Sequence, residues 1–207
     1  MRNRSLLFLL ALGLVVACGT PPRPFTAAWE APLHVRADTN AALPVTVYAF
    51  ADARPGDDKR RVLRYDTTED PAAVHATVPV GQGVARMFAR GLTARGFRVT
   101  DMTTRDYAKP GASERVAIAG RVTEFDARIE RRNILGSTRQ HAGCRVTLEA
   151  YEAASGRRVF EKTYMRVAEG AMSVTEPLQF LARALADVVE QAVTDPDLIR
   201  AVRSVSG

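Results

Sequence analysis

Residues 80–100 read VGQGVARMFARGLTARGFRVT, and this stretch decides the fold. Four apolar residues recur at four-residue steps, on one face of a helix: Val80, Val84, Phe88 and Leu92. The pattern predicts a helix over Gly81–Arg95. Gly96 stands where helices commonly end in a left-handed conformation. The residues that follow it, Phe97–Thr100, are typical of a strand.

A strand is also expected before this helix. Residues 45–50 read VTVYAF, which is rich in β-branched and aromatic side chains. A strand, a helix and a strand in this order imply a right-handed crossover between two parallel strands. Residues 51–78 lie between the first strand and the helix, and we expect them to form a long polar connection. Connections of this length are uncommon in compact domains and tend to be functional.

The following part of the chain predicts an antiparallel meander. Apolar residues alternate over 116–129 and change phase near Glu124, which indicates one long strand with a bulge. The same alternation over 144–150 predicts a second strand. The turn sequence at 154–157 then returns the chain as a third strand over 158–167.

Two helices are expected at the C-terminal end. Apolar residues between Leu178 and Ala192 mark one face of an amphipathic helix that begins near Thr175–Pro177. Asp195 and Pro196 suit the N-cap and the first position of a short last helix. The expected fold class is α/β (α+β), with two main helices on one face of a mixed sheet of about five strands. One βαβ unit comes first, and the meander and the C-terminal helices follow.

The N-terminal residues have the pattern of a secretory signal peptide. Arg2 and Arg4 precede an apolar run of twelve residues, Leu6–Ala17. This run is too short to span a bilayer, which takes about 20 apolar residues. The protein is therefore expected to be exported.

The end of the run, Val15-Val16-Ala17-Cys18-Gly19, resembles the lipobox of bacterial lipoproteins. The resemblance implies that Cys18 becomes the first mature residue and carries palmitate-type acyl chains. Two acyl chains suffice for stable anchoring. Gly19, in place of an aspartate, implies the periplasmic face of the outer membrane.

The expected organisation is a lipoprotein signal peptide at 1–17, a lipidated cysteine with a Pro-rich tether at 18–43, and a single α/β domain at 44–207. Prolines favour an extended backbone in the tether. At about 3.1 Å per residue, residues 19–43 would reach roughly 75 Å. Trp29, the only tryptophan, is expected to dock on the domain.

The composition excludes several classes of protein. The chain has 29 Lys plus Arg against 23 Asp plus Glu, a formal net charge of +6. Removal of residues 1–17 takes away two arginines and leaves 27 against 23, or +4. An exported protein meets little nucleic acid, so none is expected as a partner. Two cysteines cannot build a disulfide scaffold or a four-cysteine zinc site.

No catalytic or cofactor-binding motif is complete. Gly81-Gln82-Gly83 opens a helix, but Arg86 occupies the place of the third glycine of a dinucleotide fingerprint. His141 and Cys144 have metal-ligand spacing, yet zinc needs three or four ligands. We expect Cys144 to be a small buried residue instead. The chain is expected to have no enzyme activity, no metal and no cofactor beyond the lipid on Cys18.

The connection at 51–78 holds the strongest candidate contact region. The residues expected to meet a partner are Asp52, Arg54, Lys59, Arg60, Arg61 and Arg64. Arginine suits bidentate binding of phosphate and carboxylate. In the cell envelope these anions belong to lipid headgroups, lipopolysaccharide, peptidoglycan or acidic proteins. The alternative is that these residues form a solvated face without a partner.

Two segments resemble the YajG-type envelope lipoproteins. Val45–Arg54 is a strand that leads to Asp-x-Arg, and Leu92–Val99 is a helix end followed by Gly-Phe-x-Val. The layout is also similar to the amino-terminal domain of TolB and to lipoprotein activators of peptidoglycan synthases. The resemblance implies a small α/β binding module and not an enzyme.

These observations predict an outer-membrane-anchored periplasmic lipoprotein that is a non-enzymatic binding or accessory module for an envelope partner. That partner is expected to be an envelope protein, peptidoglycan or anionic lipid. One alternative is an auxiliary lipoprotein of a lipid or lipopolysaccharide transport system that binds anionic lipid. Another is an envelope hydrolase, which would require a cleft with converging titratable groups.

Overall fold

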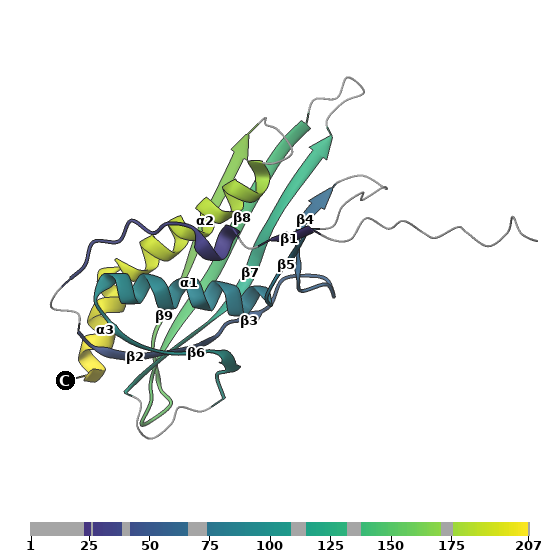
Figure 1. The fold of residues 1–207 in the computed structure, drawn as a ribbon. Helices are drawn as coiled ribbons and strands as arrows, with labels where there is room; N and C mark the ends of the chain where they lie inside the picture. Colours follow the sequence, from purple (N-terminus) through teal and green to yellow (C-terminus); the bar gives the residue numbers. More distant parts are fainter. Residues whose placement is uncertain are drawn as a thin grey trace, which may run out of the picture.

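The computed structural model describes residues 23–25, 27–38, 42–65, 74–108, 115–131, 138–170 and 176–206. In these ranges nine strands form one mixed sheet. Helices α1 (Val80–Arg95) and α2 (Glu176–Val193) cross the same face of it, and α3 (Pro196–Ser206) follows α2 (Figure 1). The α+β class with two main helices on one face is confirmed, and the sheet has more strands than the sequence predicted.

The expected βαβ unit is present. Strands β2 (Pro44–Ala49) and β6 (Arg98–Asp106) run parallel, and α1 lies between them in the chain. Gly96 ends α1 with a φ of +111°, and its N–H donates to the carbonyl oxygen of Leu92 at 3.1 Å. Glycine adopts this left-handed conformation without steric cost, which explains the sharp return into β6.

The expected meander is also present and is longer than the sequence predicted. Strand β7 (Val116–Arg131) pairs antiparallel with β8 (Thr138–Glu152), and β8 pairs antiparallel with β9 (Arg158–Gly170). The register between β7 and β8 shifts between Val122 and Glu124, which confirms the expected bulge.

The prediction of one long polar connection over 51–78 was wrong, because this stretch contains three short strands. They are β3 (Ala51–Asp52), β4 (Arg61–Tyr65) and β5 (Val74–Ala76). β8 covers one edge of β7, while β2, β3 and β4 pair in succession along its other edge. Two arginines interrupt the apolar alternation of β4, and this conceals the strand in the sequence.

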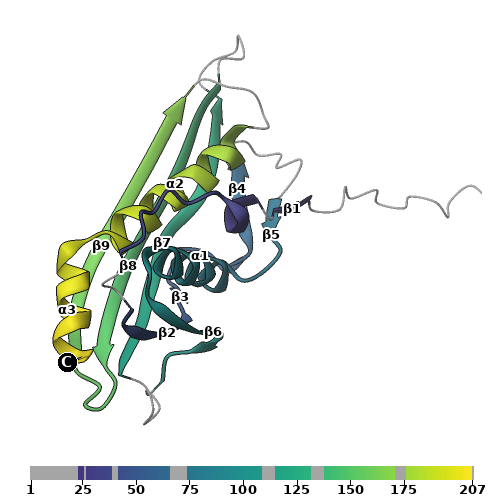
Figure 2. The same ribbon diagram turned by 60° about the vertical axis from the view of Figure 1, so that its left-hand side comes forward.

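The N-terminal segment packs on the domain from Arg23 onward. Strand β1 (Arg23–Phe25) pairs in parallel with β5, and a 3-10 helix, η1 (Ala27–Glu30), follows it. Trp29 stacks on the ring of Phe125 with 5.4 Å between the ring centroids, which confirms that it docks on the domain. The chain then runs beside α1 and α2 to Asp38 (Figure 2). The described part of the expected tether therefore lies against the domain.

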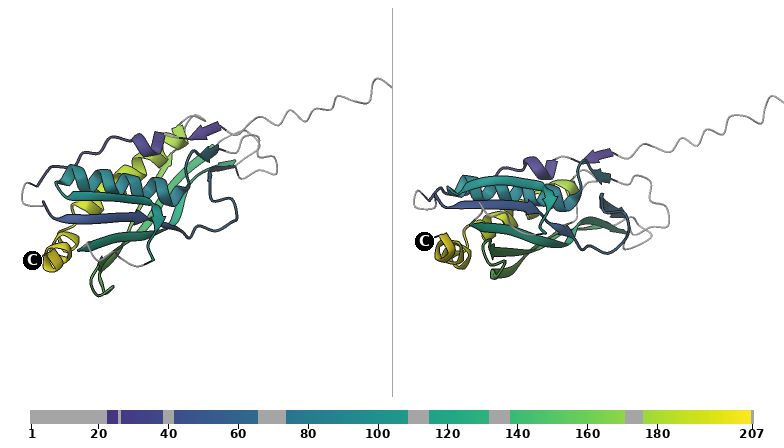
Figure 3. Two further views of the ribbon diagram at one scale, coloured as in Figure 1. Left: turned by 60° about the horizontal axis from the view of Figure 1, so that its bottom comes forward. Right: turned by 90° about the horizontal axis from the view of Figure 1, so that it is seen from below.

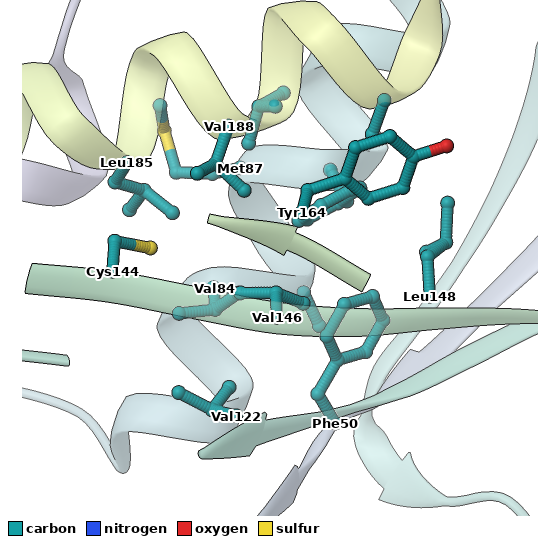
Figure 4. Packing of buried hydrophobic residues seen from close by; sticks show 14 of the residues in the cluster. Phe50, Val84, Met87, Val122, Cys144, Val146, Leu148, Tyr164, Leu185 and Val188 are labelled. Atoms are coloured by element: carbon teal, nitrogen blue, oxygen red, sulfur yellow. The ribbon is translucent and has the colours of Figure 1, made fainter. Parts of the chain in front are cut away.

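The core fills the space between the sheet and the two helices, which lie together on one side of the strands (Figure 3). Met87 of α1 and Leu185 of α2 are fully buried together with Val146 and Leu148 of β8 (Figure 4). Cys144 is also fully buried, and burial raises the pKa of its thiol well above the usual range. Its expected role as a small buried residue is confirmed.

Some predicted features lie outside the described residues. These are the signal peptide over 1–17, the acylated Cys18 and the residues that follow it as far as Pro22. None of the helices in the described part of the chain is long and apolar enough to cross a membrane.

Candidate functional site

The candidate contact loop connects β3 to β4 and is held by an ion pair between Asp52 and Arg54. Nε of Arg54 donates to Oδ1 of Asp52 at 2.9 Å, and Nη2 donates to Oδ2 at 2.8 Å. This geometry is the bidentate form that suits a guanidinium and a carboxylate. Arg54 is only 4% exposed and the Asp52 side chain 14%, so both charges lie inside the fold.

Arg54 also closes the loop through backbone carbonyl groups. Nη1 donates to the carbonyl oxygens of Arg61 and Phe125, each at 2.9 Å, and Nη2 donates to that of Lys59. Nζ of Lys59 donates in return to the carbonyl oxygen of Arg54. One buried guanidinium thus joins the loop to the start of β4 and to β7. Asp52 and Arg54 shape the candidate site from within.

Arg60 lies on the outer surface of this loop, whereas Lys59 and Arg61 beside it are partly buried. Arg60 is exposed, and its guanidinium has no hydrogen-bond partner within the described ranges. Asp58 lies beside it, with Oδ2 at 2.7 Å from Nε2 of His75. Partial burial raises the pKa of Asp58. The hydrogen bonds from His75 and from the Arg60 backbone N–H outweigh this effect, so the pKa lies below its usual value.

Strand pairing places the backbone of further basic residues beside β4. In the parallel pair of β4 and β7, Arg64 stands opposite Arg128. The Arg128 side chain pairs with Asp126 at 2.8 Å. Strand β5 pairs with both β4 and β1, and β1 begins at Arg23. The sequence does not reveal this clustering, because it depends on strands that were not expected.

The motifs weighed for cofactor binding are part of the packing. A Cβ atom on Gly81 would lie 2.0 Å from the carbonyl oxygen of Phe50, and one on Gly83 would lie 2.6 Å from the indole of Trp29. Both glycines therefore allow neighbours to approach α1 closely. Cys144 is buried in the core, and no group of three or more His, Cys, Asp or Glu residues in the described ranges could hold a metal.

A second buried polar cluster joins α3 to β9. Asp195 is 6% exposed, and its Oδ2 accepts hydrogen bonds from Nζ of Lys162 at 2.7 Å and from the hydroxyl of Tyr164 at 2.8 Å. Its Oδ1 accepts from the backbone N–H of Asp197 at 2.8 Å, which confirms the expected cap of α3. Burial, and next the bond to Asp195, raise the pKa of Tyr164 far above its usual value. The hydroxyl therefore stays protonated, and its hydrogen bond joins β9 to the start of α3.

Asp195→Ala is expected to lower the free energy of unfolding by about 2–4 kcal/mol at neutral pH. The substitution removes the cap of α3 and leaves the buried hydroxyl of Tyr164 without its acceptor. Denaturant unfolding of the mature protein measures the change. Asp197→Ala, at an exposed position on the same helix, is the matched control and should change the free energy by no more than about 0.5 kcal/mol.

The same cluster gives stability a pH dependence. Burial raises the pKa of Asp195, but the bonds from Lys162 and from the Asp197 backbone outweigh it, so the folded-state pKa lies below 3.8. The contribution of Asp195 to the free energy of unfolding is therefore complete above pH 3.8. It is lost as the pH falls through the pKa that Asp195 has in the folded protein. The contribution of Tyr164, whose pKa is raised, is complete below pH 10.0 and is lost above it. Asp195→Ala should therefore reduce the loss of stability at acid pH. Tyr164→Phe should reduce the loss of stability at alkaline pH.

Comparison with known proteins identifies the fold. No family model matches the sequence, and no curated protein matches it. The structure is similar to that of the protein XCC0632 from Xanthomonas campestris, family DUF330, with a TM-score of 0.62. The match covers 88% of this chain and 97% of that chain at 12% sequence identity. At this identity the likeness is one of fold.

Two bacterial lipoproteins are also among the similar structures. Lipoprotein GNA1162 from Neisseria meningitidis matches with a TM-score of 0.40 at 12% identity, over 70% of this chain and 96% of that chain. A minor lipoprotein from Acinetobacter baumannii matches with a TM-score of 0.36 at 13% identity, over 79% and 96% of the two chains. The likeness in fold rests on XCC0632, whose α+β fold the described part of this chain shares.

Proposed function

We propose that this protein is an outer-membrane lipoprotein, anchored through Cys18, whose α+β domain is a non-enzymatic binding module for an anionic envelope partner. The contact surface is the loop between β3 and β4, with the exposed Arg60 outside, Lys59 and Arg61 partly buried beside it, and the Asp52–Arg54 ion pair beneath. The lipobox-like sequence before Cys18 supports the anchor. The same sequence is the basis for the proposed location at the outer membrane.

The observation that carries the binding role is the way in which Arg54 holds this loop. Arg54 is buried and bonded to one carboxylate and to three carbonyl groups of this loop and its neighbours. Such bonds fix the backbone of the loop before any partner arrives. A preformed loop loses less conformational entropy on binding, which increases affinity. The exposed Arg60 is thus presented in a fixed place.

Arg60→Glu is expected to reduce capture of the partner about tenfold or more, since a hydrogen bond to a charged group contributes roughly 1.5–3 kcal/mol. Crosslinking of the native lipoprotein in cells, followed by quantification of the captured species, measures the effect. Arg105→Glu is the matched control, because Arg105 is an exposed arginine on β6. Equal capture by both variants would contradict this contact surface.

The alternative function, an auxiliary role in lipid or lipopolysaccharide transport, uses the same basic residues. It differs from the proposed binding module in one requirement: a carrier must remove a lipid molecule from a membrane. Lipid that copurifies in a fixed molar ratio with the mature protein, and is lost in Arg60→Glu, would favour this alternative.

A further inference from the structure

We propose that the loop between β3 and β4 rests on the anionic headgroups of the membrane that carries the anchor. The partner of the basic residues is then the lipid surface itself, and the domain has a fixed orientation on it. This inference rests on the proposed anchor at Cys18. It goes further in naming what the loop meets and which end of the domain faces the membrane.

The first argument is the short distance between the anchor and the fold. Only Gly19, Thr20, Pro21 and Pro22 separate Cys18 from Arg23, the first residue of β1. Five residue steps span at most roughly 18 Å when fully extended. The sequence alone allowed a tether of roughly 75 Å. The pairing of β1 with β5 shortens that reach, so the β1 end of the domain must lie close to the lipid surface.

The second argument is that β1 cannot easily be drawn away from the domain. Beyond β1, Nη1 of Arg90 donates to the carbonyl oxygen of Trp29 at 2.5 Å, and the backbone N–H of His34 donates to Oε1 of Glu190 at 2.5 Å. The indole of Trp29 is partly buried, packs against the core and stacks on the ring of Phe125. These contacts hold the chain to both α1 and α2, so the spacer does not lengthen without loss of buried contacts.

The third argument is that the basic loop lies beside β1. Pro24 of β1 stands opposite His75 of β5, and His75 stands opposite Arg61 of β4. At about 4.8 Å per strand, Arg61 lies about 10 Å from β1. The backbone N–H of Ala76 also donates to the carbonyl oxygen of Arg60 at 2.8 Å, which fixes the loop to β5. The anchored strand and the basic loop therefore lie near each other, separated by about two strand spacings.

The fourth argument is the charge of this end. In residues 53–62, which the structure describes, the cations outside the Asp52–Arg54 pair are Lys59, Arg60 and Arg61, against the carboxylates of Asp57 and Asp58. Anionic headgroups attract each Lys or Arg near the surface, with about a fivefold gain in binding per residue. An acyl anchor joined to a basic patch is also an arrangement that gives stable attachment to a membrane. The opposite end of the sheet, at the β8–β9 turn, lies far from β1 (Figure 1).

The test uses the full mature lipoprotein, inserted through its own acyl chains into vesicles of phosphatidylethanolamine with or without phosphatidylglycerol. A fluorophore is attached at Thr77→Cys, directly after β5, or at Ala154→Cys, in the β8–β9 turn; both positions are exposed. The native Cys144 is fully buried, so it does not compete for the label. Quenching by a lipid with a nitroxide headgroup then reports how close each label is to the surface.

Quenching at Thr77→Cys is expected to exceed that at Ala154→Cys and to be stronger with phosphatidylglycerol than without it, because anionic headgroups attract the basic loop to the surface. Arg60→Glu should remove most of the difference, and Arg105→Glu should keep it. Equal quenching at the two labels, or no effect of phosphatidylglycerol, would overturn the orientation while leaving the anchor intact. The proposed anchor fails separately if the mature protein carries no acyl chain and does not remain with the vesicles.

Discussion

Arg54→Met is expected to lower the free energy of unfolding by about 3–5 kcal/mol, the usual cost of removing one member of a buried ion pair. The substitution leaves the carboxylate of Asp52 inside the fold without its cation. It also takes the donor away from three carbonyl groups, those of Lys59, Arg61 and Phe125. Denaturant unfolding of the mature protein measures the loss.

Two further variants separate the ion pair from the rest of the loop. Arg60→Met, at an exposed position in the same loop, should change the free energy by no more than about 0.5 kcal/mol. The double variant Asp52→Asn/Arg54→Met should be more stable than Arg54→Met alone, because it leaves no unpaired charge. If Arg54→Met costs less than about 1 kcal/mol, the buried pair does not hold the loop.

Cys18→Ala is expected to abolish attachment to the membrane. Burial of acyl chains contributes about 0.8 kcal/mol per CH₂, so two chains dominate the free energy of anchoring and the basic residues cannot replace them. The variant should appear as an unprocessed precursor or in the supernatant after membranes are sedimented. Immunoblots of the fractions measure both outcomes.

Cys144→Ala is the control for this experiment. Cys144 is buried in the core and lies far along the chain from the lipobox-like sequence, so the substitution should leave the protein with the membranes. If Cys18→Ala is processed to the mature size and still sediments with the membranes as wild type does, the anchor is not at Cys18.

Much of the fold could be predicted from the sequence, because its strongest patterns are local. The four-residue recurrence in α1, the glycine after it and the change of phase near Glu124 each reflect one helix or one strand. The cap of α3 by Asp195 was predicted for the same reason, since a cap is formed by residues that are neighbours in the sequence. Cys144 was recognised as buried from the alternation around it.

The strands β1, β3, β4 and β5 could not be predicted, because each is short and is stabilised by its neighbours in the sheet. β4 pairs with the part of β7 that follows the part paired with β3, and β1 pairs with β5. The candidate site was found in part. The sequence singled out the charged loop, but it did not distinguish the buried Arg54 from the exposed Arg60.

The βαβ unit, the meander, the C-terminal helices and the expected lipid anchor at Cys18 all follow from local patterns of residues. Only the tertiary structure decided that the chain after Cys18 is bound to the domain from Arg23, and that the basic loop lies beside it. The reason is physical. Helix periodicity, capping and an N-terminal signal depend on residues close in the sequence, whereas the pairing of short strands and the burial of Arg54 depend on contacts between residues far apart.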